Sequence, residues 1–159
     1  MKQAALAVEV TRDARSWAPS SAAMARWARA ALGRRGAGRG LAVRVVAPRE
    51  SRRLNAAWRG KDRPTNVLSF PAAPLPAGMR RSGADCPLGD LVICATVVRE
   101  EAREQGKALG SHWAHLIVHG ALHLVGYDHE KDADATRMER REIRVLRRLG
   151  IPNPYRARN

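Results

Sequence analysis

Cysteine and acidic residues are scarce in this chain of 159 residues. With only two cysteines, Cys86 and Cys94, a disulfide-rich scaffold is not expected, and a zinc finger built on cysteines is excluded. Asp and Glu number 15 against 29 Lys and Arg, which gives a formal net charge of +14. So large a surplus argues against an enzyme of small neutral metabolites. It favours a polyanionic partner, either nucleic acid or an anionic membrane surface, although a genomic bias towards arginine would account for part of it.

Long hydrophobic stretches are also missing. The longest uncharged apolar runs, such as residues 91–98, fall far short of the roughly 20 residues that a membrane-spanning helix needs. Residues 1–10 lack the charged region and long apolar stretch of a signal peptide. We therefore expect a soluble, cytoplasmic protein with no membrane partner.

The spacing of apolar residues predicts strands that alternate with helices early in the chain and helices that dominate its C-terminal half. Strands are expected at residues 4–11, 41–47, 66–70 and 88–94. Helices are expected at residues 20–32, 50–58, 97–107, 112–125 and from 132 onwards. Ser111 and Asp132 are candidate N-caps of the last two helices. This order predicts an α/β (α+β) fold in which one small mixed sheet packs with about five helices.

Two stretches do not fit a helix or a strand. Residues 71–87 contain four prolines and two glycines, and they predict a loop longer than most connections, which hints at a functional segment. The tail at residues 152–159 is polar and is expected to be loose. The length of the chain fits a single domain over residues 1–159.

All five histidines lie between residues 112 and 129. His119 and His123 are four residues apart on a helix that is apolar nearly all round, so both rings point to one face of a buried helix. Gly126 ends that helix, and the chain can then turn back to bring His129 to the same point. Three imidazoles with an open fourth position are typical of a catalytic zinc, whose bound water has a pKa of about 7. Imidazole also suits other divalent transition metals such as nickel or iron, and the sequence does not choose among them.

The histidines allow other assignments, either as core residues or as a different pair of metal ligands. A single buried histidine is more often a hydrogen-bonded core residue than a ligand, but this spacing reverses the preference. His115 forms a second pair with His119, yet three ligands over two helical turns span about 12 Å, too far for one ion. We favour the pair of His119 and His123 because Gly126 follows it closely. His115 is then a core or supporting residue, and His112 is expected to be exposed.

The residue after the first ligand separates this pattern from a metalloprotease. The HExxH motif carries its catalytic Glu directly after the first His, where this chain has Gly120. A zincin-like metal site is still expected, but its chemistry must be organised differently.

The segment from His119 to His129 reads HGALHLVGYDH, which resembles the HGxLHLxGYDH signature of the bacterial YbeY endoribonucleases, also called rRNA maturation factors. Two earlier blocks resemble the same family. They are LN and WRGKD followed by PTNVLSFP within residues 54–71, and LGDLVIC at residues 88–94. Glu101, Met138 and Glu142 also fit. The resemblance covers about residues 50–150 in the same order.

The resemblance implies a zinc-dependent, single-strand-specific endoribonuclease that acts in 16S rRNA 3′-end maturation and ribosome quality control. Its partners would be rRNA, other single-stranded RNA and the ribosomal small subunit. The family's zinc ligands fall on His119, His123 and His129, and its functional arginine falls on Arg59. A guanidinium can clamp the charged oxygens of a phosphodiester transition state, although Arg59 stands out from the other arginines only through its motif.

Several polar residues near these motifs have two alternative roles. Asp128 is a candidate catalytic residue that either orients a ligand imidazole or acts as a base, but capping the turn after Gly126 is an equal alternative. Thr65, Asn66 and Ser69 either hold substrate or cap the start of a strand. Asp90 is expected to be structural.

Two other functions compete with the nuclease. The first is a non-catalytic ribosome-assembly factor with a structural metal, and the second is a metallopeptidase, which the missing Glu and the basic charge disfavour. Aromatic residues are few, with one Phe, two Tyr and four Trp. Because few rings are available for stacking on bases, we expect weak sequence preference if the chain cuts RNA.

Overall fold

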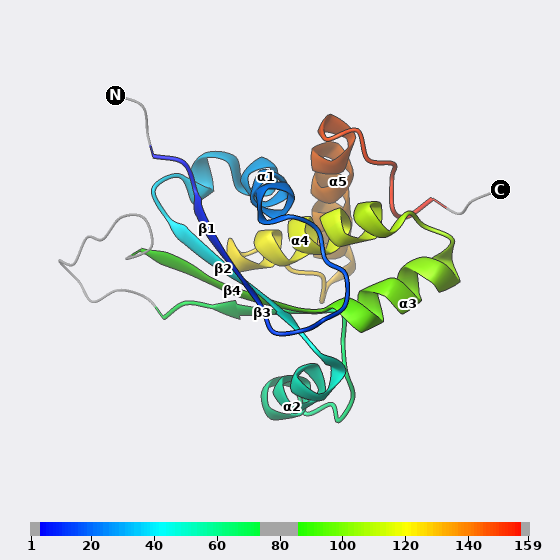
Figure 1. Cartoon of the computed structure of the whole chain (residues 1–159). Helices are drawn as coiled ribbons and strands as arrows, with labels where there is room; N and C mark the ends of the chain where they lie inside the picture. The colour runs from blue at the N-terminus through cyan, green and yellow to red at the C-terminus, as the bar shows by residue number, and fades with distance from the viewer. Residues whose placement is uncertain (1–3, 74–85, 157–159) are drawn as a thin grey trace.

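The computed structural model describes residues 4–73 and 86–156, which form one layered α/β structure (Figure 1). Its strands are β1 (Ala7–Arg12), β2 (Gly40–Val46), β3 (Val67–Pro71) and β4 (Pro87–Cys94). Its helices are α1 (Ser21–Leu32), the short 3-10 helix η1 (Gly33–Gly36), α2 (Pro48–Arg59), α3 (Ala95–Gln105), α4 (Leu109–Leu124) and α5 (Asp132–Arg148). The predicted fold class, with a small mixed sheet and five α-helices, is confirmed.

The four strands form one mixed sheet in the order β1-β2-β4-β3. Strands β1, β2 and β4 run parallel, and β3 pairs antiparallel with β4. The central strands β2 and β4 are buried along most of their length, as expected for strands covered on both faces. Helix α2 lies on one face of the sheet, and α1 and α4 lie on the other (Figure 1).

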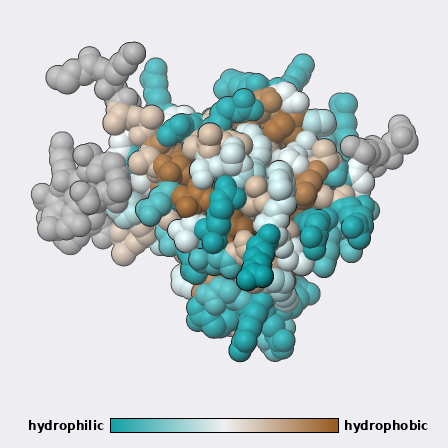
Figure 2. Space-filling view, in the orientation of Figure 1, coloured by the Kyte–Doolittle hydropathy of each residue, from teal (hydrophilic) through white to brown (hydrophobic). Residues whose placement is uncertain are grey.

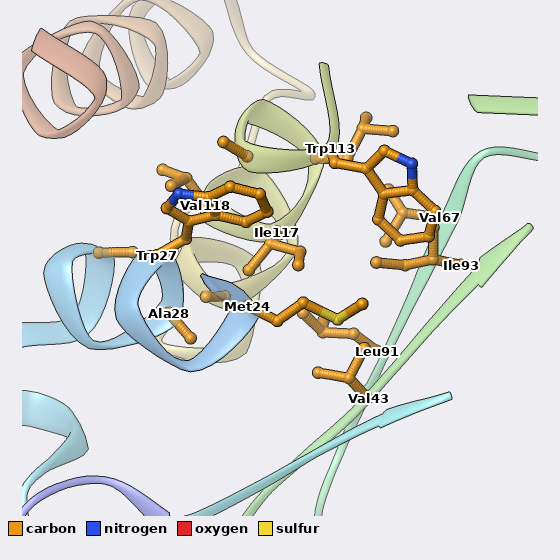
Figure 3. Close-up of a cluster of buried hydrophobic side chains, with 14 of the residues drawn as sticks. Met24, Trp27, Ala28, Val43, Val67, Leu91, Ile93, Trp113, Ile117 and Val118 are labelled. Atoms are coloured by element: carbon orange, nitrogen blue, oxygen red, sulfur yellow. The ribbon is translucent and has the colours of Figure 1, made fainter. Parts of the chain in front are cut away.

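The main core lies between α1, α4 and the sheet, and Figure 3 shows how the three layers meet. Trp113, Ile117 and Val118 of α4 are fully buried there against Met24 of α1 and Leu91 of β4. Burial of such side chains stabilises the fold by roughly 1.5–3 kcal/mol each. The prediction of a helix buried in the middle of the domain is therefore confirmed, and α4 is held rigidly by its surroundings.

A smaller core lies on the opposite face of the sheet. Val46, Leu68 and Val92 are buried there, with Leu54 and Phe70 packed against them. Helix α2 supplies Leu54 and turns its charged residues outwards, and Figure 2 shows hydrophilic side chains over this part of the molecule. This packing fixes α2, whose last residues reach the site described below.

Some element boundaries differ from the prediction. Helix α4 begins at Leu109 after Ala108, so Ser111 lies inside the helix and is not its N-cap. Asp132 is likewise the first residue of α5, and Lys131 occupies the N-cap. At the predicted loop, Pro71 is the last residue of β3 and Pro87 is the first residue of β4, and residues 74–85 lie outside the described residues.

The expectation of a loose tail at residues 152–159 is wrong at Tyr155. Its hydroxyl donates a hydrogen bond to the buried carboxylate of Glu142, and Ile151, just before the tail, packs against the main core. A polar segment can dock in this way when a single aromatic residue finds a buried partner. None of the helices in residues 4–73 and 86–156 has the length and hydropathy needed to cross a membrane.

Candidate metal centre

Three histidines converge at the C-terminal end of α4. His119 and His123 lie on its last two turns, and His129 lies on the segment that follows. Their ring nitrogens lie within 4.8 Å of one another, and the two Nε2 atoms of His119 and His123 are 3.1 Å apart. The structure thus brings together the three residues that the sequence motif singled out.

The turn after α4 depends on Gly126. Its φ of +96° is a backbone conformation that other residues rarely adopt. The Gly126 N–H donates to the His123 carbonyl, and the Tyr127 N–H donates to the Leu122 carbonyl, so the chain folds back at once. This reversal carries His129 over the end of the helix towards the other two rings.

Hydrogen-bond partners set the tautomer of both helical histidines. The Nδ1 of His119 contacts the carboxylate of Glu142, and the Nδ1 of His123 lies 2.9 Å from the carbonyl oxygen of Tyr127. A carboxylate and a carbonyl oxygen can only accept, so both Nδ1 atoms must donate. In the neutral rings the Nε2 atoms then carry lone pairs.

Two lone pairs that face each other at 3.1 Å repel unless a cation lies beside them. Burial lowers the pKa of His123, and the neighbouring charges of His119 and His129 lower it further, so this ring favours its neutral form. Neutral imidazoles held by oriented Nδ1–H bonds are the ligands that zinc and related ions take in proteins. The residues present therefore fit a metal ion.

Glu142 is the most buried charged residue near this centre, with none of its surface exposed. Its carboxylate accepts from His115 Nε2 at 3.2 Å, from His119 and from the Tyr155 hydroxyl. Burial alone raises the pKa of Glu142, but the hydrogen bonds from these three groups outweigh it and lower the pKa to about 2. Glu142 is therefore a charged anchor for His119.

Sequence reasoning named Glu142 only as a match to the family and gave it no part in the site, and it did not single out Tyr155. A signal for Glu142 was available, because Met138, Glu142 and Leu146 are four residues apart and share the buried face of α5. An acid in the middle of an apolar stripe needs a partner. No comparable pattern marked Tyr155, whose position follows from how the C-terminal segment docks.

His115 belongs to a second group. His115, His119 and Glu142 also lie close enough to share an ion, but Glu142 already accepts from both rings. Burial lowers the pKa of His115, which favours its neutral form. The interpretation of His115 as a supporting residue agrees with this placement.

The expectation that His112 is exposed is wrong. Only 4% of its surface is exposed, and its Nε2 lies 3.0 Å from the carboxylate of Glu101. The same carboxylate accepts from the Asn66 side chain, whose own oxygen accepts the Val67 N–H. Helix α3 covers the first turns of α4 and buries this ring, which no local pattern revealed.

A cleft of about 580 Å³ opens over the three histidines. It is lined by Trp58 and Arg59 from the end of α2, by residues of β3, by the segment after α4 and by Tyr155. Arg59 is exposed, and within residues 4–73 and 86–156 its guanidinium has no hydrogen bond or ion pair inside the chain. Arg59 is thus placed where it could bind an anionic ligand beside the histidines.

Asp128 also lines the cleft, but its carboxylate has a local role. Its Oδ1 accepts from the backbone N–H groups of His129 at 2.7 Å and Glu130 at 3.2 Å. These bonds shape the turn that carries His129. They favour the capping alternative for Asp128.

The backbone of Thr65 and the side chain of Ser69 are engaged within the fold. Ser51 bridges both backbone groups of Thr65, and the Ser69 hydroxyl donates to the Gly120 carbonyl at 3.2 Å.

A Cβ atom at Gly120 would approach the Leu91 side chain to 2.8 Å. The position after His119 therefore faces the sheet and has no room for a catalytic Glu, and the zincin-like part of the prediction gains no support from it.

Comparison with known proteins places the chain in a family. The family model described as Endoribonuclease YbeY matches residues 10–150. Proteins named Endoribonuclease YbeY are 52% identical over 141 residues in Halorhodospira halophila and 55% identical over 147 residues in Alkalilimnicola ehrlichii. The first match covers 89% of this chain and 90% of the relative, and the second covers 89% and 85%.

A solved structure supports the fold. The solution structure of a Thermotoga maritima protein matches with a TM-score of 0.54 and 23% identity, covering 90% of this chain and 91% of that one. At this identity the likeness concerns the fold alone. The length and identity of the sequence matches settle the family: this chain belongs to the YbeY family of endoribonucleases.

Proposed function

We propose that this protein is a zinc-dependent, single-strand-specific endoribonuclease of the cytoplasm that acts in 16S rRNA 3′-end maturation and ribosome quality control. Its partners would then be rRNA, other single-stranded RNA and the ribosomal small subunit, and residues 1–159 would form one hydrolase domain. The observation that carries the proposal is the pair of Nε2 atoms of His119 and His123, 3.1 Å apart beside His129 and facing an open cleft. Family membership supplies the reaction class.

His119, His123 and His129 would hold the ion. When bound there, zinc supplies Lewis-acid chemistry towards a phosphodiester. Glu142 and the Tyr127 carbonyl hold the first two rings with their Nδ1 protons turned away from the cleft. Because these hydrogen bonds exist before metal arrives, little reorganisation is needed on binding.

Arg59 would bind the non-bridging oxygens of the scissile phosphate. Its guanidinium has no competing partner among residues 4–73 and 86–156, and it lines the same cleft as the histidines. A planar guanidinium can hold two phosphate oxygens at once, which stabilises the charge that gathers there in the transition state. For Asp128 we favour positioning of His129 over proton transfer, because its carboxylate is engaged by two backbone N–H groups.

Trp58 offers a surface for a nucleobase beside Arg59. It is 59% exposed at the cleft, and its ring packs at a tilt against Phe70, with the ring centroids 5.0 Å apart. An exposed, supported ring next to a phosphate-binding group suits a single strand, since every base has a face that can stack. A platform of this kind agrees with weak sequence preference and with a preference for unpaired RNA.

The experiment is cleavage of a single-stranded RNA that matches a precursor 16S 3′ end, at defined metal and salt. Wild type and His123→Ala are compared at matched purity, and Arg99→Ala, an exposed change on α3, serves as the control. We expect wild type and the control to cut and His123→Ala to be inactive while it remains folded by circular dichroism.

Two other outcomes would point elsewhere. Equal cleavage by His123→Ala would contradict the metal-dependent mechanism. If neither protein cuts but both bind the RNA, a ribosome-assembly factor with a structural metal becomes the better explanation.

A further inference from the structure

Positive charge gathers on a second surface, next to the cleft but outside it. Six arginines line three adjoining hollows of about 310, 490 and 380 Å³. Tyr127 lines all three hollows, and the six residues, called here the arginine surface, are Arg34, Arg35, Arg137, Arg140, Arg141 and Arg144. They come from η1 and from α5, which are far apart in the sequence.

These arginines differ from Arg52 and Arg53 of α2, which are paired with carboxylates. Arg52 pairs with Asp62 at 2.7 Å, and Arg53 pairs with Glu50 at 2.6 Å. Among the residues that the structure describes, none of the six forms an ion pair, although Asp128 and Asp134 also line one hollow. Their charge is therefore available to an outside anion.

The arginines of α5 are spaced along one face of the helix. Arg137, Arg140, Arg141 and Arg144 stand at i, i+3, i+4 and i+7, which covers about 10 Å of helix. Arg35 extends the row onto η1, where its guanidinium lies 5.5 Å from the centre of the Tyr127 ring. A row of this length suits several successive charges of a polyanion better than one isolated phosphate.

The arginine surface is continuous with the cleft through the segment after α4. Asp128 lines both the cleft and the adjoining hollow, and the Tyr127 carbonyl accepts the Nδ1–H of the ligand His123. Helix α5 itself serves both regions, because its buried face carries Glu142 and its exposed face carries the arginines. The cleft and the hollow lined by Arg35 and Arg137 therefore adjoin at Asp128.

We propose that the arginine surface binds the phosphate backbone of RNA that flanks the cut site. The inference rests on the proposed function, since it assigns the path of the same substrate beyond the cleft. An RNA strand fits better than a protein partner because protein interfaces combine arginine with exposed aromatic and apolar anchors. The exposed large apolar residues of the described chain are Trp17, Trp58 and Tyr155, and none of them lines these hollows.

The test asks whether the effect of removing charge from the arginine surface depends on the length of the RNA. The triple variant Arg137→Ala, Arg140→Ala, Arg144→Ala removes three exposed charges from α5 and keeps good helix formers. A matched control, Arg26→Ala, Arg99→Ala, Arg103→Ala, removes three exposed charges from α1 and α3, away from the cleft and the hollows. The probes are single-stranded RNAs of about 5 and about 20 nucleotides, chosen because single-strand sites span about 4–16 nucleotides.

We expect the triple variant to bind and cut the short RNA as wild type does. For the long RNA, its KM and its dissociation constant, measured by fluorescence anisotropy, should rise about 10- to 100-fold at low salt. The slope of log affinity against log salt should flatten by about 2, because each phosphate contact in a single strand contributes about 0.7. In the control variant, the difference in KM and in dissociation constant between the short and the long RNA should stay close to that of wild type.

Three results would overturn the proposal. They are an equal loss in the control variant, an equal loss for the short RNA, or long-RNA binding that is unchanged in the triple variant. The last result would leave an acidic protein as the candidate partner. If wild type cuts neither RNA, the proposed function fails, but anisotropy still decides: long-RNA binding that only the triple variant loses supports the surface.

Discussion

The three candidate ligands are held in two different ways. His119 and His123 lie on the buried helix α4, and each ring has a partner for its Nδ1. His129 is exposed on the segment after Gly126, and no ring hydrogen bond of His129 occurs within the described residues. Its ring only packs, with centroids 5.6 Å from His119 and 4.9 Å from His123.

This difference shows what each part of the centre contributes. Helix α4 orients two candidate ligands before any ion is present, so that binding of a metal there would cost little further conformational entropy. The segment after Gly126 brings the third ring near but does not lock it. We therefore expect α4 to determine affinity and His129 to complete the coordination.

The largest effect is expected from His119→Ala. This residue belongs to both candidate ligand groups, and its loss also leaves Glu142 with a buried charge that has fewer donors. Cleavage should fall more than about 1000-fold, since a catalytic ion contributes several kcal/mol and about 1.4 kcal/mol is a factor of ten. Zinc titration by calorimetry, beside the cleavage assay, checks both losses.

His129→Ala should weaken zinc binding less than His119→Ala does, because the oriented pair on α4 remains. Since His129 is exposed, the free energy of unfolding without metal should change by no more than about 0.5 kcal/mol. Calorimetry and urea unfolding of both variants test the comparison. Equal losses of affinity in the two variants would show that the helix does not orient its ligands as described.

Glu142→Gln keeps the shape of the side chain and removes its charge. Zinc affinity should fall about 10- to 100-fold, as for other carboxylates that orient a ligand imidazole. Glu139→Gln, an exposed change on the same helix, is the matched control and should have no effect. A normal affinity in Glu142→Gln would mean that packing alone orients His119.

Stability should depend on pH through the same residues. The pKa of Glu142 is lowered from 4.5 to about 2 in the folded protein, and the pKa values of His115 and His123 are lowered from 6.5. A lowered pKa means that the unfolded chain takes up protons first, so acid favours unfolding. The metal-free protein should lose stability as pH falls below about 6.5, and should lose on the order of 2–3 kcal/mol more between about pH 4.5 and 2. Urea unfolding across this range, with Glu142→Gln as the variant that flattens the acid limb, is the measurement.

The smallest effect is expected from Tyr155→Phe. It removes one of three donors to Glu142 and leaves the ring in the cleft. The cost should be about 1 kcal/mol of stability and a loss of zinc affinity smaller than that of Glu142→Gln. Thermal unfolding and calorimetry measure the two quantities. A loss as large as that of Glu142→Gln would assign the tail a greater part in orienting His119 than its hydrogen bond to Glu142 suggests.

Local patterns in the sequence were sufficient for much of the fold and for the convergence of the histidines. The apolar periodicity of α4 predicted a buried helix, the spacing of His119 and His123 placed both rings on one face, and Gly126 predicted the reversal that returns His129. Each of these features depends on residues within a few positions of one another. Backbone geometry converts such spacing into direction without help from the rest of the chain.

What surrounds the histidines was decided by tertiary packing. The burial of His112 depends on Glu101 of α3, and the anchor of His119 comes from Glu142, 23 residues further along the chain. Tyr155 donates a hydrogen bond to Glu142 from a tail whose polar composition predicted a loose segment. These contacts join segments whose relative positions follow from the packing of whole helices, which no local pattern specifies. The sequence by itself determined which histidines could meet at one point, and the tertiary structure decided which of their nitrogens face one another there.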